Sequence, residues 1–219
     1  MSNQYAAIDR EAIWAALFAW LKLQLTAAPW AALTVVSAGQ VCLDASGHRQ
    51  KALTVGTTGA AKPSWNDAGG QTADGTGLTA FHWLDLGQGC VSMGRKDTEP
   101  PQLTIPDQPA LFQVADKEIH VPQKPPGAPS KLALKGFLYI YAYNPSPTED
   151  IGEETVLGET VINRLLFAID NAFQPDDFTS GKFTIGGLVT HCWIEGITEI
   201  DPGIFGDQCG ARIPLNILV

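Results

Sequence analysis

Two stretches of the chain repeat apolar residues at the spacing of an α-helix. Residues 9 to 28 begin at Asp9, a residue type that caps helix N-termini, and end before Pro29. Residues 155 to 174 end before Pro175, which cannot continue a helix. The pattern therefore predicts two amphipathic helices. Their apolar positions are Ile13, Trp14, Leu17, Phe18, Leu21 and Leu25 in the first and Val161, Ile162, Leu165, Leu166, Ile169 and Phe173 in the second.

The segment LALKGFLYIYAYN, residues 132 to 144, alternates with the period of two that is typical of a β-strand. One face is aliphatic (Leu134, Leu138, Ile140) and the other is aromatic (Phe137, Tyr139, Tyr141, Tyr143). We expect the two helices to cover the aliphatic face. The aromatic face then forms either a second core layer or a surface that another subunit buries.

Further strands are expected in LVTHCWIEGITEI and CGARIPLNILV, and at residues 33 to 37, 91 to 95 and 110 to 115. Pro214 indicates that the last strand lies at a sheet edge or carries a bulge. Residues 39 to 88 differ from the rest, because short pieces such as QVCLD, KALTV and FHWLDL alternate with glycine-rich turns.

The expected architecture is therefore α+β, with a mainly antiparallel sheet packed against two helices and a small inserted all-β subdomain. Residues 1 to 38 and 89 to 219 would form the core domain, and residues 39 to 88 the inserted β-rich module. A chain of 219 residues is long enough for one domain with an insertion of this size.

The charge excludes a protein that grips nucleic acid. Fourteen Lys and Arg stand against 23 Asp and Glu, which gives a formal net charge of -9. An acidic surface lining a channel would instead repel DNA and let it slide past. The apolar run around Lys22 is too short for a bilayer and no basic region precedes it, so we expect a soluble, cytoplasmic origin without a membrane partner.

Nucleotide, metal and catalytic signatures are weak. In GTTGAAKPSW, Lys62 follows two alanines and precedes Pro63, unlike the lysine of a phosphate-binding loop. His191 and Cys192 are neighbours on an expected strand, so they cannot bind one ion together. The four cysteines show no CxxC pair and are expected as reduced thiols, and Cys209 in GDQCGA is better explained as a buried apolar residue than as a nucleophile. The sequence thus predicts no enzyme, no cofactor and no metal site.

The aromatic residues Trp65, Phe81 and Trp83 of the 39 to 88 segment allow two interpretations. They could form a sugar-stacking platform, or they could supply the core of a small module. The core is favoured, because little else in the segment is apolar. Trp65 and Trp83 are retained as candidate surface aromatics.

Five segments together resemble the tail terminator (tail completion) proteins of tailed bacteriophages: REAIWAALFAWL, VSMGRK followed by DQPALFQV, LKGFLYIYAY, ETVINRLLFAID, and GGLVTHCWIEGITEIDPGIFGDQCGARIPLNILV. The resemblance covers about residues 10 to 37 and 90 to 219 and includes no catalytic signature. It implies a structural protein of the virion neck, assembled in the host cytoplasm. The implied partners are five further copies in a homohexameric ring, the tail tube protein, the head-tail connector protein and, in a contractile tail, the sheath. DNA would pass through the lumen without specific binding.

Residues 39 to 88 depart from that family and resemble a small β-module of phage tail-fibre proteins. The alternatives are a head-tail connector, stopper or tube subunit, and a carbohydrate-binding decoration protein. A long hairpin between neighbours would favour a tube subunit, and the sequence shows no clear candidate. Arg95, Lys96, Glu195 and Asp207 are the candidate subunit-interface residues, because they are charges expected at strand ends or in loops.

Overall fold

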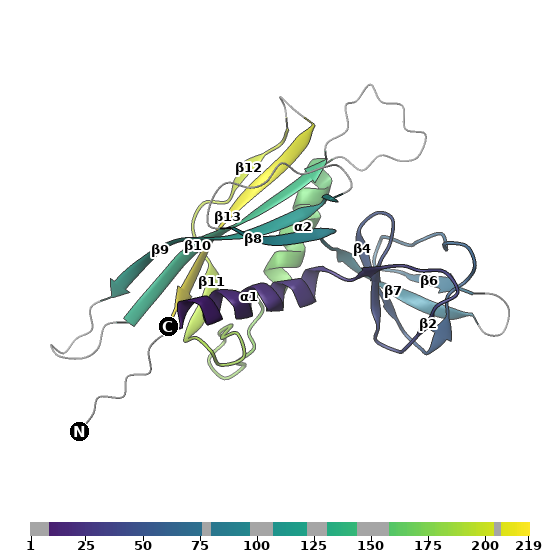
Figure 1. Ribbon diagram of the computed structural model, residues 1–219, viewed down its shortest axis with the longest axis horizontal. Helices are drawn as coiled ribbons and strands as arrows, with labels where there is room; N and C mark the ends of the chain where they lie inside the picture. The colour runs from purple at the N-terminus through teal and green to yellow at the C-terminus, as the bar shows by residue number, and fades with distance from the viewer. Residues whose placement is uncertain (1–8, 76–79, 97–106, 122–130, 144–157, 204–206) are drawn as a thin grey trace.

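The computed structural model describes residues 9–75, 80–96, 107–121, 131–143, 158–203 and 207–219. This part of the chain is α+β and mostly sheet, with two helices and sheets of mixed and antiparallel pairing. Figure 1 shows the larger sheet beside the two helices, and the strands of residues 28 to 88 together at one end of the molecule.

Both predicted helices are present. Helix α1 spans Arg10–Leu25 and begins as expected at Asp9, whose Oδ1 accepts a hydrogen bond from the amide of Ala12 at 2.9 Å. It ends before residue 28, because Thr26 is already extended and its amide donates to the carbonyl of Lys22. Helix α2 spans Gly158–Ala172, while residues 155 to 157 of the predicted helix lie outside the described residues.

The larger sheet has the strand order β11-β13-β10-β9-β8. Strand β12 also pairs with β13, at a different stretch of β13 from the one that β11 pairs with. Its pairs are antiparallel apart from the parallel pair of β8 and β9. The strands are β8 (Ser92–Lys96), β9 (Ala110–Val121), β10 (Lys131–Tyr143), β11 (His191–Ile194), β12 (Glu199–Asp201) and β13 (Gln208–Leu218). Helix α1 and strand β13 thus belong to one fold, although they lie more than a hundred residues apart in sequence.

Helices α1 and α2 cover one face of this sheet. In β10 the even-numbered residues from Leu132 to Ala142 face the helices, and the five with side chains are buried. They belong to one apolar cluster with Leu17 and Leu21 of α1 and Leu165 of α2. The predicted aliphatic face is therefore confirmed as the core. The odd-numbered side chains of β10 are half-buried or exposed, so the aromatic face is not a second core layer within the described part of the chain.

Pro214 does not mark an edge strand, which was the first of the two predicted alternatives; the irregular pairing beside it is closer to the second, a bulge. Strand β13 lies between β10 on one side and β11 and β12 on the other. On the side of β11 and β12, however, the pairing is interrupted. Strand β11 stops pairing after Ile194, which lies opposite Leu215, and β12 starts at Glu199, which lies opposite Arg212. Pro214 falls in this gap, which Gly196 approaches closely, so an inner strand accommodates a residue that lacks an amide donor.

The second sheet has the strand order β1-β3-β4-β7-β6. Its strands are β1 (Ala28–Pro29), β3 (Val41–Leu43), β4 (His48–Ala52), β6 (Gln71–Asp74) and β7 (Phe81–Gln88), and a two-stranded ribbon joins β2 (Val35–Val36) to β5 (Gly56–Thr57). A strand is thus present within the predicted range of 33 to 37. It pairs with β5 and does not belong to the larger sheet. Because β1 pairs with β3, pairing in this sheet starts before residue 39.

Strands β9 and β10 form the long hairpin that the sequence did not predict. Their pairing runs from Ala110 opposite Tyr141 to Val121 opposite Lys131, with one register shift beside Gly136. Residues 115 to 120 of β9 are exposed, and the end of this hairpin extends to the left of the helices in Figure 1. A pattern of alternating apolar residues could not reveal this segment, because its sequence, ADKEIH, is polar on both faces.

Neither helix of the described residues is long and apolar enough to cross a membrane.

Gly136 lies where α1 packs on the sheet, and a substitution at this position tests that contact. A Cβ at this position would lie 2.4 Å from the carbonyl oxygen of Val114 and 2.8 Å from Cη2 of Trp14. We expect Gly136→Ala to lower the free energy of unfolding by about 1–3 kcal/mol, because neither backbone nor a packed indole can yield easily. Urea denaturation measures the change. Gly210→Ala is the control, since its Cβ would meet only ordinary contacts of 3.5 Å or more, and equal losses would contradict the argument.

Candidate functional site

A cavity of about 680 Å³ lies between α2 and the second sheet. The second sheet contributes His48, Arg49, Asp85 and Leu86, and α2 contributes Arg164 and Phe167. We call it the α2 cavity. Leu86 and Phe167 are 40% and 70% exposed, which is high for large apolar side chains beside a cavity. The α2 cavity thus offers apolar surface to a molecule that enters it.

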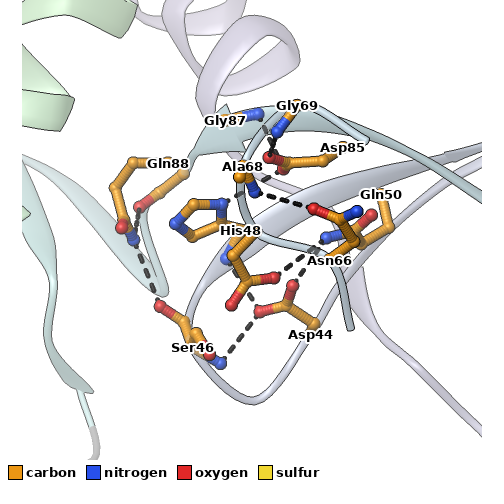
Figure 2. A network of polar contacts seen from close by, with 12 residues as sticks. Asp44, Ser46, His48, Gln50, Asn66, Ala68, Gly69, Asp85, Gly87 and Gln88 are labelled. Atoms are coloured by element: carbon orange, nitrogen blue, oxygen red, sulfur yellow. Dashed lines mark hydrogen bonds and ion pairs between the residues drawn. The ribbon is translucent and has the colours of Figure 1, made fainter. Parts of the chain in front are cut away.

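A buried histidine forms one wall of the α2 cavity. His48 is 2% exposed, its Nδ1 lies 3.1 Å from Oδ1 of Asp85, and its Nε2 lies 3.3 Å from Nη1 of Arg164. Since arginine can only donate, Nε2 is the acceptor and Nδ1 carries the proton that is donated to Asp85. The contact joins β4, β7 and α2. Figure 2 shows that Asp85 also accepts from the amides of Gly69 and Gly87.

The arrangement of His48 and Asp85 resembles the base and orienting carboxylate of a catalytic triad. The Nε2 atom, which would activate a nucleophile, is occupied by Arg164. No serine or cysteine is among the residues that line the α2 cavity. The three side chains are therefore a polar link between the second sheet and α2.

A second polar network lies beside the first in Figure 2 and organises the β3–β4 turn. Oδ1 of Asp44 accepts from the amides of Ser46 and His48, and Nε2 of Gln50 donates to Oδ2 of Asp44 at 2.7 Å. Burial raises the pKa of Asp44, and the charge of Asp67 adds to the rise. The turn residues are held by hydrogen bonds within the fold, so this network has a structural role.

Two guanidinium groups and two carboxylates line the α2 cavity, from Arg49, Arg164, Asp67 and Asp85. Nη2 of Arg49 donates to the carbonyl of Leu23 at 3.3 Å, and its Nε is buried without a hydrogen-bond partner among the described residues. Burial lowers the pKa of Arg49. Asp85 also lines the α2 cavity, but His48 and two backbone amides already bind its oxygens. The α2 cavity is therefore lined by as many acidic as basic side chains.

The structure corrects the interpretation of Trp83 as a surface aromatic. Trp83 is 1% exposed, and its Nε1 donates to Oδ2 of Asp74 at 2.9 Å. Trp30 donates to the same oxygen at 2.8 Å, so one carboxylate satisfies two indoles. Trp65 is half-buried and packs edge-on against Trp83 at 6.1 Å between ring centroids. The pair belongs to the core of the second sheet and presents no flat platform for a sugar.

The second candidate surface is the face of the larger sheet that α1 and α2 leave open. We call it the aromatic face and define it by residues that share one side of the sheet by register: Phe112, which is itself buried at 6% exposed, and the half-buried Phe137, Tyr139, Tyr141 and Trp193. Phe112 and Tyr141 meet edge-on at 6.2 Å, and Phe137 lies 6.2 Å from Tyr139. The guanidinium of Arg212 stacks over Phe137 at 3.6 Å. This surface is wide, amphipathic and ordered by its own contacts.

The four candidate interface charges do not converge. Arg95 forms a two-pronged ion pair with Glu11 of the same chain, at 2.6 and 3.0 Å, which fastens β8 to α1. Lys96 ends β8 at one side of the sheet. At the other side Glu195 accepts from Nε1 of Trp193 at 2.7 Å, and Asp207 is exposed just before β13. They form no common site.

The described residues include no group of three His, Cys, Asp or Glu side chains that could hold a metal ion. His191 is half-buried on the aromatic face and Cys192 is buried on the other, as the alternation predicted. Cys209 is 1% exposed, and its thiol donates to the carbonyl of Pro202. Burial raises the pKa of this thiol, which argues against a nucleophile.

Protein-family models give no match to the chain, and neither do curated proteins. The functional argument therefore rests on the two surfaces themselves.

The α2 cavity was not predicted from the sequence, although the residue pattern of β4 pointed to one of its residues. Residues of β4 alternate so that His48 and Gln50 share a face with Ala52, and all three are buried. That periodicity could have placed His48 inside the second sheet. Nothing in the sequence indicated that α2 would supply the opposite wall, because the contact joins residues 116 positions apart.

His48 is expected to contribute to stability and not to catalysis. We expect His48→Ala to lower the free energy of unfolding by about 1–3 kcal/mol, because Asp85 and Arg164 lose their shared buried partner. Urea denaturation gives this value. The matched control is His82→Ala, since His82 is exposed on β7 of the same sheet. A loss no greater than that of the control would contradict the assigned role.

The four thiols are expected to be unreactive in the folded protein. Cys42, Cys90, Cys192 and Cys209 are all free and buried, and burial raises the pKa of both Cys42 and Cys90 to about 12. At pH 8 a chromogenic disulfide reagent should therefore label less than one thiol per chain in the native state and four in urea. Rapid native labelling of any one of them would show that its site opens to solvent.

Proposed function

We propose that this protein is a structural subunit of the neck of a tailed bacteriophage, which forms a ring that caps the tail tube and joins it to the head connector. The observation that carries the proposal is the aromatic face. A six-stranded sheet has one face covered by two helices, and its other face carries aromatic rings from three strands, β9, β10 and β11. Such a surface is typical of a chain that completes its core by assembly.

The aromatic face has the composition of a protein interface. It combines phenylalanine and tyrosine with Arg212 and Trp193, the residue types that dominate binding energy at interfaces. Glu199 pairs with Arg212 at 3.1 Å, so part of its charge is already neutralised. Burial of these rings against a neighbouring copy would stabilise a ring without any new covalent or metal link.

The charge of the chain agrees with a DNA conduit. A formal net charge of -9 opposes tight binding to phosphates, so DNA could pass a ring of such subunits without being held. The partners are then further copies of this chain, the tail tube protein and the head-tail connector protein, with the sheath added in a contractile tail. Its location would be the virion neck.

We also propose that residues 28 to 88 form the inserted β-rich module, which starts earlier than the residue 39 expected from sequence. Support comes from the pairing of β1 with β3 and of β2 with β5. Further support comes from a separate apolar cluster around Phe81 and Trp83, to which Trp30 and Trp65 add. The module would decorate the outside of the ring.

The β9–β10 hairpin favours a second candidate, a tail tube subunit. Residues 115 to 120 are exposed, and the hairpin reaches beyond the helices. In a tube, such an arm would span the boundary between neighbouring subunits or stacked rings. The two candidates differ in what they build, because a terminator stops at closed rings and a tube subunit continues to polymerise.

Assembly of the purified protein tests the proposal. We expect light scattering at high concentration to give a discrete mass that is a small multiple of the chain, and negative-stain electron microscopy to show rings. Their central hole should admit duplex DNA, whose diameter is roughly 20 Å. Long tubes would instead establish the second candidate. A strictly monomeric particle, even when mixed with phage tail tubes, would refute both.

Tyr139→Asp tests whether the aromatic face is the surface that is buried. A carboxylate in the middle of this face should reduce the fraction of assembled protein at least about tenfold, because it would be desolvated without a partner. Lys22→Asp serves as the control, since Lys22 is exposed on α1, which lies on the covered side of the sheet. Equal assembly by both variants would contradict the assignment.

A further inference from the structure

The outer part of the β9–β10 hairpin carries a basic surface on an acidic protein. Three lysines share the side of the hairpin that continues the aromatic face of the sheet, and Lys117 of β9 lies directly opposite Lys135 of β10. Ile119, which is 40% exposed, lies on the same side, opposite Ala133. We call this surface the lysine face and define it by Lys117, Ile119, Lys131 and Lys135.

The charge of the lysine face is not neutralised within the described part of the chain. Asp116 lies 3.6 Å from Lys117, and the other two lysines have no ion pair with another described residue. Glu118 lies on the opposite side of the hairpin, where it pairs with Arg10 at 2.6 Å. Three lysines and Asp116 thus leave a net charge of +2. Like charges placed directly opposite on neighbouring strands also destabilise a sheet, as Lys117 and Lys135 are.

The other end of the same sheet has a depression with the opposite sign of charge. Its volume is about 330 Å³, and we call it the β12 pocket. Glu199 and Asp201 alternate on β12, so both lie on the side of Arg212. Two carboxylates and one guanidinium give the β12 pocket a net charge of -1, and the exposed Asp207 directly precedes it in sequence. The residues used here are Tyr139, Tyr141, Glu199, Asp201, Gln208 and Arg212.

The carboxylates of the β12 pocket retain capacity to bind an ammonium group. Oε2 of Glu199 accepts from Arg212 at 3.1 Å, and Oδ1 of Asp201 accepts from the amide of Gly203 at 2.9 Å. The second oxygen of each carboxylate accepts no hydrogen bond from another described residue. The side chain of Glu199 is 63% exposed, so solvent reaches it. The tyrosine rings add aromatic surface, which attracts a cation and an apolar side chain alike.

We propose that the lysine face of one copy binds the β12 pocket of a second copy. The two surfaces cannot meet within one chain, because Lys131 and Tyr141 are separated along β10 by roughly 33 Å at about 3.3 Å per residue. Figure 1 shows the free end of the hairpin and β12 at different ends of the larger sheet. The contact is therefore head-to-tail, and each copy can bind two neighbours. Contacts of this kind close into a ring or continue into a filament.

Charge selects a second copy as the occupant. The docked carboxylates would relieve the repulsion between Lys117 and Lys135, and Ile119 would gain apolar contact with the tyrosine rings. Duplex DNA also attracts lysines, but a chain with a formal net charge of -9 repels it. The inference rests on the proposed function for self-association and adds the residues that join neighbouring copies.

Assembly of the full chain tests the contact. Lys131 is exposed, so Lys131→Glu should leave the fold intact but raise the protein concentration needed for half-assembly at least about tenfold in sedimentation experiments. Asp201→Lys in the same chain should restore assembly, because it exchanges the two charges. Lys51→Glu is the matched control, since Lys51 is an exposed lysine on β4 of the second sheet. Assembly of the wild type should weaken as the salt concentration rises.

Chemical cross-linking of the wild type tests proximity. A carbodiimide joins an ammonium group to a carboxylate without a spacer, and mass spectrometry of the digested product identifies the joined residues. We expect links from the lysine face to Glu199 or Asp201. Such links must join two copies, because the ends of β10 are too far apart within one chain. Lys51 is the internal control and should not link to either carboxylate.

The outcomes separate this contact from the proposed function. Rings that form equally well in Lys131→Glu, or that give no such links, would overturn the contact and leave the ring function standing. Rings that persist in Lys131→Glu but lose binding to tail tubes or to duplex DNA would assign the lysine face to that partner and would also overturn the contact. A wild-type protein that remains monomeric with and without tail tubes would overturn both.

Discussion

The one-sided burial of strands β10 and β13 is the constraint on which the rest of the structure depends. Their aliphatic side chains, Leu134 and Leu138 opposite Ile217 and Ile213, are covered by α1 and α2. The close approach of Trp14 to Gly136 sets how near α1 can lie. The two helices cover one face of the sheet, and among the described residues its aromatic side has no helix over it.

The second sheet is joined to this core by polar contacts and not by a shared apolar cluster. Its own cluster centres on Phe81 and Trp83, while His48 connects Asp85 to Arg164 of α2. A junction built on hydrogen bonds leaves unfilled space beside it, which is the α2 cavity. The position that a buried histidine stabilises is therefore also the place where the surface is hollowed and lined by charged side chains of both signs.

Three features of the molecule point outward: the aromatic face, the β9–β10 hairpin and the turn of residues 177 to 182, which carries the exposed Phe178. Each is ordered by contacts within the chain, such as Arg212 over Phe137 and Asp177 with Ser180, yet each leaves apolar or unpaired groups in solvent. Exposed apolar groups of this kind are typical of surfaces at which proteins meet.

The sequence by itself determined both helices, the Asp9 cap, the two faces of β10 and the opposite orientations of His191 and Cys192, because these depend on local periodicity and capping. It did not determine where strands pair: Pro214 lies inside the sheet, Val35 pairs with Thr57 outside the larger sheet, Trp83 is buried, and Arg95 binds Glu11 of its own chain. Those outcomes, and the α2 cavity with them, were decided only by tertiary structure, since each depends on which distant segment packs alongside, and residue spacing does not encode that choice.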